Sequence, residues 1–203
     1  MEGVAVNKLD QRAFDRLLLD RVSDIESVLH QLKDPESVQA VEEVAGEIED
    51  TIRNGHKLLF FGNGGSAADA GHMAAEFVGR CVHESDPLPA LSLTDSPAIL
   101  TALANDYGYE QVFARQVTAL ARPGDMVFGL SGSGRSANVL AGLRQARELE
   151  LRTIALTGTT GGQMETVADV VMRAPSDVIG RIQEVHKIWG HLWAEWVEIR
   201  LFG

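Results

Sequence analysis

The chain has 203 residues, 45% of them hydrophobic, and a formal net charge of −11 at pH 7. This length is typical of one domain that buries its own core without disulfides. The negative charge argues against nucleic acid as a partner, because binding a phosphate backbone needs a basic face. No run of about 18 apolar residues occurs and the N-terminus lacks the apolar stretch of a signal peptide, so we expect no membrane partner. The single cysteine, Cys81, fits the reducing cytoplasm, which is the location we predict.

Two amphipathic helices are predicted at the start of the chain. Residues 7–32 carry apolar side chains at helical spacing, namely Phe14, Leu17, Leu18, Val22, Ile25, Leu29 and Leu32. A second helix is predicted at 36–54, where Asp34-Pro35 is a start signal. Residues 1–55 are therefore predicted to form an N-terminal helical hairpin.

From residue 58 onward the pattern changes to short apolar runs bounded by Gly, Pro, Asp or Ser. Five of these runs are predicted strands, at 58–61, 90–93, 126–130, 153–156 and 169–172. Their brevity and lack of alternation are typical of strands buried on both faces of a parallel sheet. Helices are predicted between and after them, at 66–79, 97–104, 110–121, 136–149, 161–168 and 179–201. The alternation predicts an α/β fold, a doubly wound five-stranded parallel sheet sandwiched by helices in residues 56–203, within a single domain 1–203.

Two predicted strands run into loops of glycine and serine that open helices. The first loop is Phe61-Gly62-Asn63-Gly64-Gly65-Ser66, and the second runs from Leu130 to Ser136 with the sequence LSGSGRS. Such loops and the free amides of the following helix suit an anion, and serine hydroxyls add donors. The alternative is that the serines are only helix N-caps and the glycines only turn formers. Because two loops occur at comparable strand ends, where ligands of doubly wound sheets bind, we favour a phosphate site.

The first loop also resembles the dinucleotide-binding fingerprint, through Gly62, Gly64 and Ala67. The acidic residue after the second strand is Asp95, more than thirty residues further on, whereas the fingerprint places it about twenty residues on. The hydroxyl-rich loop suits a terminal phosphate better than a pyrophosphate. We therefore do not favour a nicotinamide enzyme.

His72 and Glu76 stand four residues apart on the predicted helix that follows the first loop, so they share one face. Such a pair can bind a metal or act as an acid and a base, although it is more often a solvated surface. The C-terminal helix offers Gln183 and His191, eight residues and about 12 Å apart along the axis. One metal could join these two only through extended side chains or across subunits.

Three tryptophans, Trp189, Trp193 and Trp196, follow one another at spacings of four and three on the last predicted helix. One stripe of this kind is typical of a core or a subunit contact. We favour that interpretation over a platform for stacking bases.

Four segments of the chain resemble a known family. They are FFGNGGSAADAGHMAAEFVGR at 60–80, SLTDSPAILTALANDYGY, LSGSGRSANVL and GRIQEVHKIWGH. Together they are similar to the phosphoheptose isomerases, also called sedoheptulose 7-phosphate isomerases, of the SIS-domain superfamily. The resemblance runs from about residue 40 to the end of the chain and implies an SIS-type fold.

The resemblance implies a role for individual residues. It implies that Ser66, Ser131, Ser133 and Ser136 hold the phosphate, and that Gly64 and Gln183 are also substrate-binding residues. It implies that Asn63, Arg80 and Asp106 frame the sugar. It further implies one zinc ion per subunit, bound by His72, Glu76, Gln183 and His191.

The implied reaction is the interconversion of sedoheptulose 7-phosphate and D-glycero-D-manno-heptose 7-phosphate, an aldose–ketose isomerisation through an enediol, for heptose biosynthesis. Glu76 and His191 are the implied catalytic pair, and the implied assembly is a homotetramer with active sites between subunits. The alternative is a non-catalytic SIS module that binds sugar phosphates or regulates replication. The set His72, Glu76, Gln183 and His191 favours the enzyme.

Overall fold

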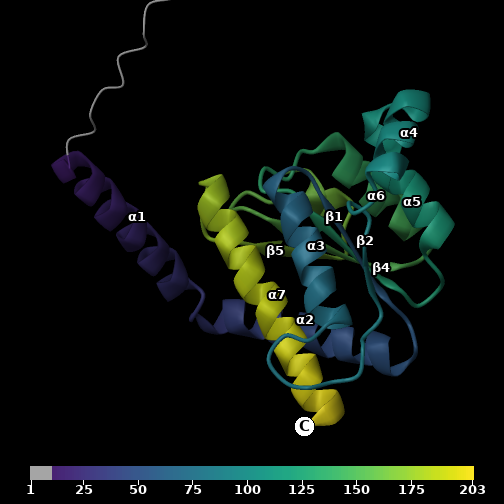
Figure 1. Ribbon diagram of the computed structural model, residues 1–203, viewed down its shortest axis with the longest axis horizontal. Coiled ribbons are helices and arrows are strands. Elements are labelled where there is room, and N and C mark those ends of the chain that lie inside the picture. Colours follow the sequence, from purple (N-terminus) through teal and green to yellow (C-terminus); the bar gives the residue numbers. More distant parts are fainter. Residues whose placement is uncertain (1–10) are drawn as a thin grey trace, which may run out of the picture.

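The computed structural model describes residues 11–203, which form a three-layered α/β fold (Figure 1). Its helices are α1 (Gln11–Gln31), α2 (Pro35–Arg53), α3 (Gly65–Val78), α4 (Pro97–Tyr107), α5 (Val112–Leu120), α6 (Ala137–Glu148) and α7 (Ile179–Phe202). Its strands are β1 (Leu58–Gly62), β2 (Ala90–Ser92), β3 (Met126–Leu130), β4 (Arg152–Thr157) and β5 (Val170–Arg173). Within the described residues, no helix has the length and apolar character that crossing a membrane requires.

The five strands form one parallel sheet in the order β2-β1-β3-β4-β5, which confirms the predicted sheet. All five residues of β1 and of β3 are buried, as expected for strands covered on both faces. Phe60 and Phe128 pack on the side of α2, α3 and α7, whereas Phe61 packs with Phe113 on the side of α5 and α6. The chain reverses its winding direction between β1 and β3. In sheets of this order, ligands bind at that switch point.

The two N-terminal helices are present, and they differ in burial. Asp34 caps α2 by accepting hydrogen bonds from the backbone amides of Glu36 and Ser37, and α2 then buries Val44 and Ile48 against the core. In contrast, α1 extends away from the body of the molecule (Figure 1). The part of the predicted first helix at 7–10 lies outside the described residues.

One predicted helix is wrong. The segment 161–168 contains only a short 3-10 turn, Met164–Thr166. Gly161 and Gly162 precede the turn with φ of +67° and +60°, which a right-handed helix excludes. A Cβ on Gly162 would lie 2.6 Å from the carbonyl oxygen of Gly134, so the two glycine turns press against each other and support the loop after β3.

Candidate active site

A small cavity lies between the carboxyl ends of β1 and β3, the place that the sheet order indicates. Its volume is about 230 Å³. Both predicted loops line it, together with the start of α7: Asn63, Gly65, Ser66, Leu130, Ser131, Gly132, Ser133, Ser136, Ile179 and Gln183. None of these lining side chains is charged, so an anion in this cavity would be bound by hydroxyls, amides and the first turns of α3 and α6.

The serines of this cavity are not simple helix caps. Ser136 stands at the N-cap position of α6 but makes no capping hydrogen bond there, and its hydroxyl lies 2.9 Å from that of Ser131. Ser66 lies inside α3, whose N-cap is Gly64 with a φ of +57°, and only 5% of Ser66 is exposed. Ser133 accepts a hydrogen bond from the backbone amide of Arg135. All four serines line the cavity, and the hydroxyls of Ser131 and Ser136 face each other there.

Asn63 is held in place by two residues that the sequence analysis missed. Its side-chain amide exchanges two hydrogen bonds of 2.8 Å with the amide of Asn138, which is buried at the start of α6. The hydroxyl of Tyr109 donates a third bond, 2.9 Å long, to Oδ1 of Asn63. The position of Asn138 two residues after Ser136 was the available signal, whereas the sequence held none for Tyr109.

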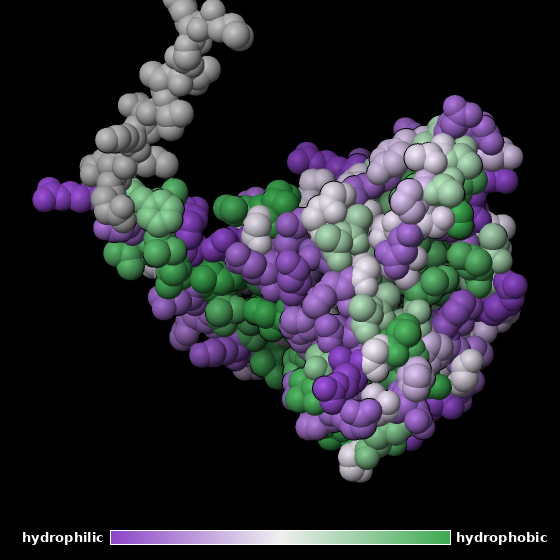
Figure 2. All heavy atoms as spheres, viewed as in Figure 1, coloured by the Kyte–Doolittle hydropathy of each residue, from purple (hydrophilic) through white to green (hydrophobic). Residues whose placement is uncertain are grey.

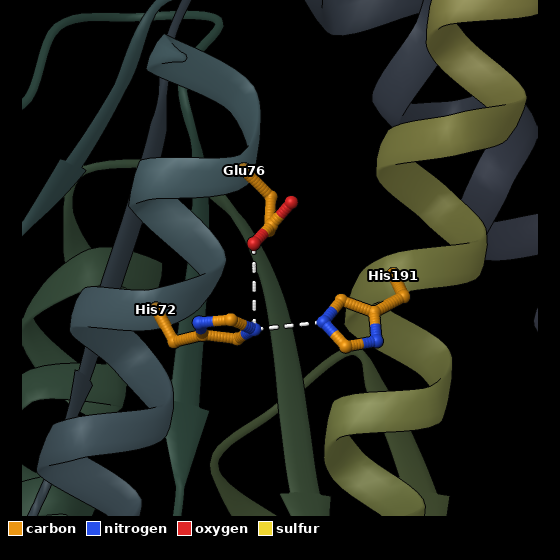
Figure 3. Close-up of side chains that lie close together, drawn as sticks. All are labelled: His72, Glu76 and His191. Atoms are coloured by element: carbon orange, nitrogen blue, oxygen red, sulfur yellow. Dashed lines mark hydrogen bonds and ion pairs between the residues drawn. The ribbon is translucent and has the colours of Figure 1, made fainter. Parts of the chain in front are cut away.

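Three side chains converge between α3 and α7 (Figure 3). His72 and Glu76 from α3 meet His191 from α7, and one ligand atom of each lies within 4.8 Å of the others. The Nε2 atoms of His72 and His191 are 2.7 Å apart, and Nε2 of His72 is 3.4 Å from Oε1 of Glu76. Two imidazole nitrogens and one carboxylate oxygen facing one point are a donor set that suits zinc.

Gln183 and His191 lie at different positions along α7, one at the serine cavity and one at the three converging side chains. The side chain of Gln183 reaches into the serine cavity, where its Nε2 lies 3.5 Å from the hydroxyl of Ser66. The structure therefore brings together three of the four predicted zinc ligands and places Gln183 beside the predicted phosphate ligands. Its role as a fourth zinc ligand stays a prediction.

The remaining predicted residues lie outside the cavity. Asp106 is exposed on α4 and accepts a hydrogen bond from Asn105. Arg80 follows α3 and pairs with Glu84 at 2.9 Å, an exposed contact. Their contacts to a sugar stay predictions.

The loop after α3 is fixed to α7 beside the three converging side chains. The carboxylate of Glu198 accepts hydrogen bonds from the backbone amides of Cys81, Val82 and His83. Burial alone would raise the pKa of Glu198, but these three donors hold it below its ordinary value. Burial, and then the neighbouring Glu76, raises the pKa of the Cys81 thiol to about 12, so Cys81 is a neutral thiol there.

Comparisons with known proteins by family model, by sequence and by structure agree on one family. The SIS domain family matches residues 22–158. The phosphoheptose isomerase of Roseiflexus sp. strain RS-1 is 47% identical over 190 residues, 94% of this chain and 96% of the relative. That of Aquifex aeolicus is 51% identical over 160 residues, 79% of this chain and 84% of the relative. The solved phosphoheptose isomerase of Neisseria gonorrhoeae superposes with a TM-score of 0.86 at 34% identity, covering 92% of this chain and 99% of that one.

Proposed function

This chain belongs to the phosphoheptose isomerases, an enzyme family with the SIS domain, and from this premise we propose that it interconverts sedoheptulose 7-phosphate and D-glycero-D-manno-heptose 7-phosphate. The observation that carries the proposal is the pairing of two sites along α3 and α7. The uncharged serine cavity lies at one end of this helix pair, and His72, Glu76 and His191 lie further along it. A phosphate bound at the first site would align the carbonyl end of the same sugar with the second.

The proposed phosphate ligands are Ser66, Ser131, Ser133 and Ser136, with the amides of the two loops. Hydroxyls and helix amides provide donors without a cation, which suits a chain of net charge −11. Asn63, Arg80 and Asp106 are proposed to frame the sugar, and Gly64 and Gln183 to contact the substrate. Binding energy from the phosphate would thus orient the reacting carbons.

The proposed reaction moves two protons, one between carbons and one between oxygens. Glu76 as base takes a proton from C1 of the open-chain ketose while the oxygen at C2 is protonated, which gives a cis-enediol. Glu76 then returns its proton to C2 while the hydroxyl at C1 loses its proton, which gives the aldose. His191 carries the proton that leaves the oxygen at C1 and the proton that joins the oxygen at C2. His72 holds both partners, since it contacts Glu76 and His191 directly.

Zinc is the proposed cofactor, one ion per subunit. His72, Glu76 and His191 are placed to bind it, with Gln183 proposed as a fourth ligand. When bound, the ion would stabilise negative charge on the substrate oxygens. A ligated Glu76 is less basic than a free one, so its roles as ligand and base compete.

The proposed assembly is a cytoplasmic homotetramer with active sites between subunits. Apolar side chains along the described part of α1 support an assembly, because Phe14, Leu17, Leu18 and Val22 are 43–53% exposed. Figure 2 shows hydrophobic surface along α1 and on the neighbouring part of α7. An apolar groove of about 320 Å³ lies next to it, lined among others by Leu32, Val38, Leu192 and Trp196. Apolar surface of this extent is typical of an interface.

Replacement of the proposed proton-transfer pair tests the function. Glu76→Gln and His191→Ala should each lower kcat for sedoheptulose 7-phosphate by about 100-fold or more, because each removes a group that moves a proton. Glu148→Gln, an exposed change on α6, is the matched control and should leave turnover unchanged. Turnover near the wild-type rate in both site variants would contradict the proposal.

A further inference from the structure

Helices α3 and α7 lie side by side and contact each other in a regular series of steps. Gln183 approaches Ser66, Lys187 approaches Asp69, His191 approaches His72, and Glu198 approaches Cys81. The positions rise together along both helices, so the helices run parallel. Consequently the contact between Asp69 and Lys187 lies between the serine cavity and the three converging side chains.

Lys187 shares one face of α7 with the residues on either side of it. Gln183, Lys187 and His191 are spaced four residues apart, so each successive side chain lies about 6 Å further along the axis. The Nζ of Lys187 is 3.3 Å from Oδ1 of Asp69, and 49% of the Lys187 side chain is exposed. An ammonium group has three donors, and the contact with Asp69 uses one of them.

Asp69 is a buried carboxylate with unused bonding capacity. Only 2% of Asp69 is exposed, and its Oδ2 has no hydrogen-bond partner among residues 11–203. Burial raises the pKa of Asp69, and Lys187 opposes that effect. A buried carboxylate with one oxygen unbonded lowers stability, so the pair is not explained by stability alone. The contact with Asp69 thereby holds Lys187 between the serine cavity and the three converging side chains.

We propose that Lys187, held by Asp69, contacts the hydroxyls in the middle of the sugar chain and so selects the substrate. The inference rests on the proposed function, in which the phosphate occupies the serine cavity and C1 and C2 lie at Glu76 and His191. The hydroxyl-bearing carbons of a seven-carbon chain must then pass Lys187. Its ammonium donates hydrogen bonds to those hydroxyls, a contact that a shorter sugar phosphate cannot make while also reaching both ends.

The test compares Lys187→Met with Lys187→Arg in the zinc-loaded, full-length protein. Four quantities are measured: kcat and KM for sedoheptulose 7-phosphate, the inhibition constant of inorganic phosphate, the bound zinc and the melting temperature. We expect Lys187→Met to lower kcat/KM about tenfold or more, mainly through KM, because a hydrogen bond from a charged donor is lost. Inhibition by phosphate and zinc content should stay within about twofold, and Lys187→Arg should restore part of the loss because it keeps a cation beside Asp69.

Two results would overturn the proposal. One is a kcat/KM within about twofold of wild type in Lys187→Met, since no substrate contact would then have been lost. The other is that Lys187→Met also loses bound zinc or inhibition by phosphate. Such a result would show that the contact between Asp69 and Lys187 only holds the two helices together. If the wild-type protein has no turnover, the proposed function fails by itself. Calorimetry on Lys187→Met and the wild type then tests the contact. Weaker binding of sedoheptulose 7-phosphate by the variant, with unchanged binding of phosphate, supports the contact. Binding of both ligands equal to that of the wild type contradicts it.

Discussion

Asn63 makes three hydrogen bonds with Asn138 and Tyr109, and they fix the orientation of its amide at the mouth of the serine cavity. Neither partner was predicted. Tyr109 lies more than forty residues from Asn63 in the chain, and only the turn between α4 and α5 brings them together. The serines were predictable because they adjoin strand ends, where the fold class itself defines a ligand site. Contacts between distant loops carry no such local signal.

We predict that Tyr109→Phe raises KM for the sugar phosphate several-fold and leaves kcat and the melting temperature nearly unchanged. The hydroxyl orients Asn63, whereas Tyr109 as a residue is 57% exposed and adds little to the core. Steady-state kinetics and a thermal melt measure the effect. Tyr107→Phe is the matched control, since Tyr107 is similarly exposed and packs its ring under Arg115. An unchanged KM in Tyr109→Phe would show that Asn63 needs no such support.

His186 is a fully buried histidine outside the proposed machinery. Its Nε2 lies 3.2 Å from the carbonyl oxygen of Thr157, and its ring stacks on Trp189. Its Nδ1 has no hydrogen-bond partner in the described part of the chain. Burial lowers the pKa of His186 from 6.5 to about 4. The folded protein therefore keeps His186 neutral over a range in which the unfolded chain binds a proton, and this linkage lowers stability as pH falls from about 6.5 to about 4.

We predict that lowering the pH from 7 to 5 costs about 2 kcal/mol of unfolding free energy through His186 alone. Urea unfolding at both pH values, with a chelator present so that no metal contributes, measures the change. His186→Gln should remove this component, because its amide does not titrate but can still donate to the carbonyl of Thr157. An equal pH dependence in the variant and the wild type would refute the assignment.

Among the helices and strands, those whose structure is decided by hydrophobic pattern were predictable from the sequence. Strands β1 and β3 were predicted because a strand that is covered on both faces needs a continuous run of apolar residues. The segment 161–168 failed because two glycines lead into it, and the close approach of Gly162 to Gly134 decides its path. That tertiary contact overrides the helical preference of the residues that follow.

The parallel packing of α3 on α7 depends on an anchor beyond the proposed site. We predict that Glu198→Gln destabilises the protein by about 1.5–3 kcal/mol, because an amide cannot accept all three backbone hydrogen bonds that the carboxylate accepts. Urea unfolding gives the magnitude, and hydrogen exchange should show the amides of residues 81–83 losing protection. Glu195→Gln, at an exposed contact with His83, should leave both measurements unchanged. Full protection of those amides in Glu198→Gln would mean that other contacts hold the loop.

At the scale of the molecule, the predicted stripe of tryptophans divides into two environments. Trp189 and Trp193 are in the core, as favoured from their spacing, whereas Trp196 is 38% exposed at the rim of the apolar groove. The described part of α1 is amphipathic as predicted, and its apolar face has no partner of matching extent within residues 11–203. The hydrophobic periodicity of a sequence identifies an apolar helix face, but it does not identify the surface that covers this face.

We predict that the double substitution Leu17→Glu/Leu18→Glu dissociates the assembly, because charges placed in an apolar interface lose hydration without gaining a partner. Sedimentation velocity should show a tetramer for the wild type and smaller species for the variant. Ser23→Glu, an added charge at an exposed polar position of the same helix, should keep the wild-type state. A wild-type monomer would contradict the proposed assembly.

The most direct test of the central claim is conversion of sedoheptulose 7-phosphate by the purified protein, followed by NMR with zinc and again after treatment with a chelator. The account predicts that an aldoheptose 7-phosphate forms with zinc, that its formation stops with the chelator, and that added zinc restores it. Absence of turnover while the sugar phosphate still binds would contradict the account and would identify the protein as a member of the family that binds without catalysing the reaction.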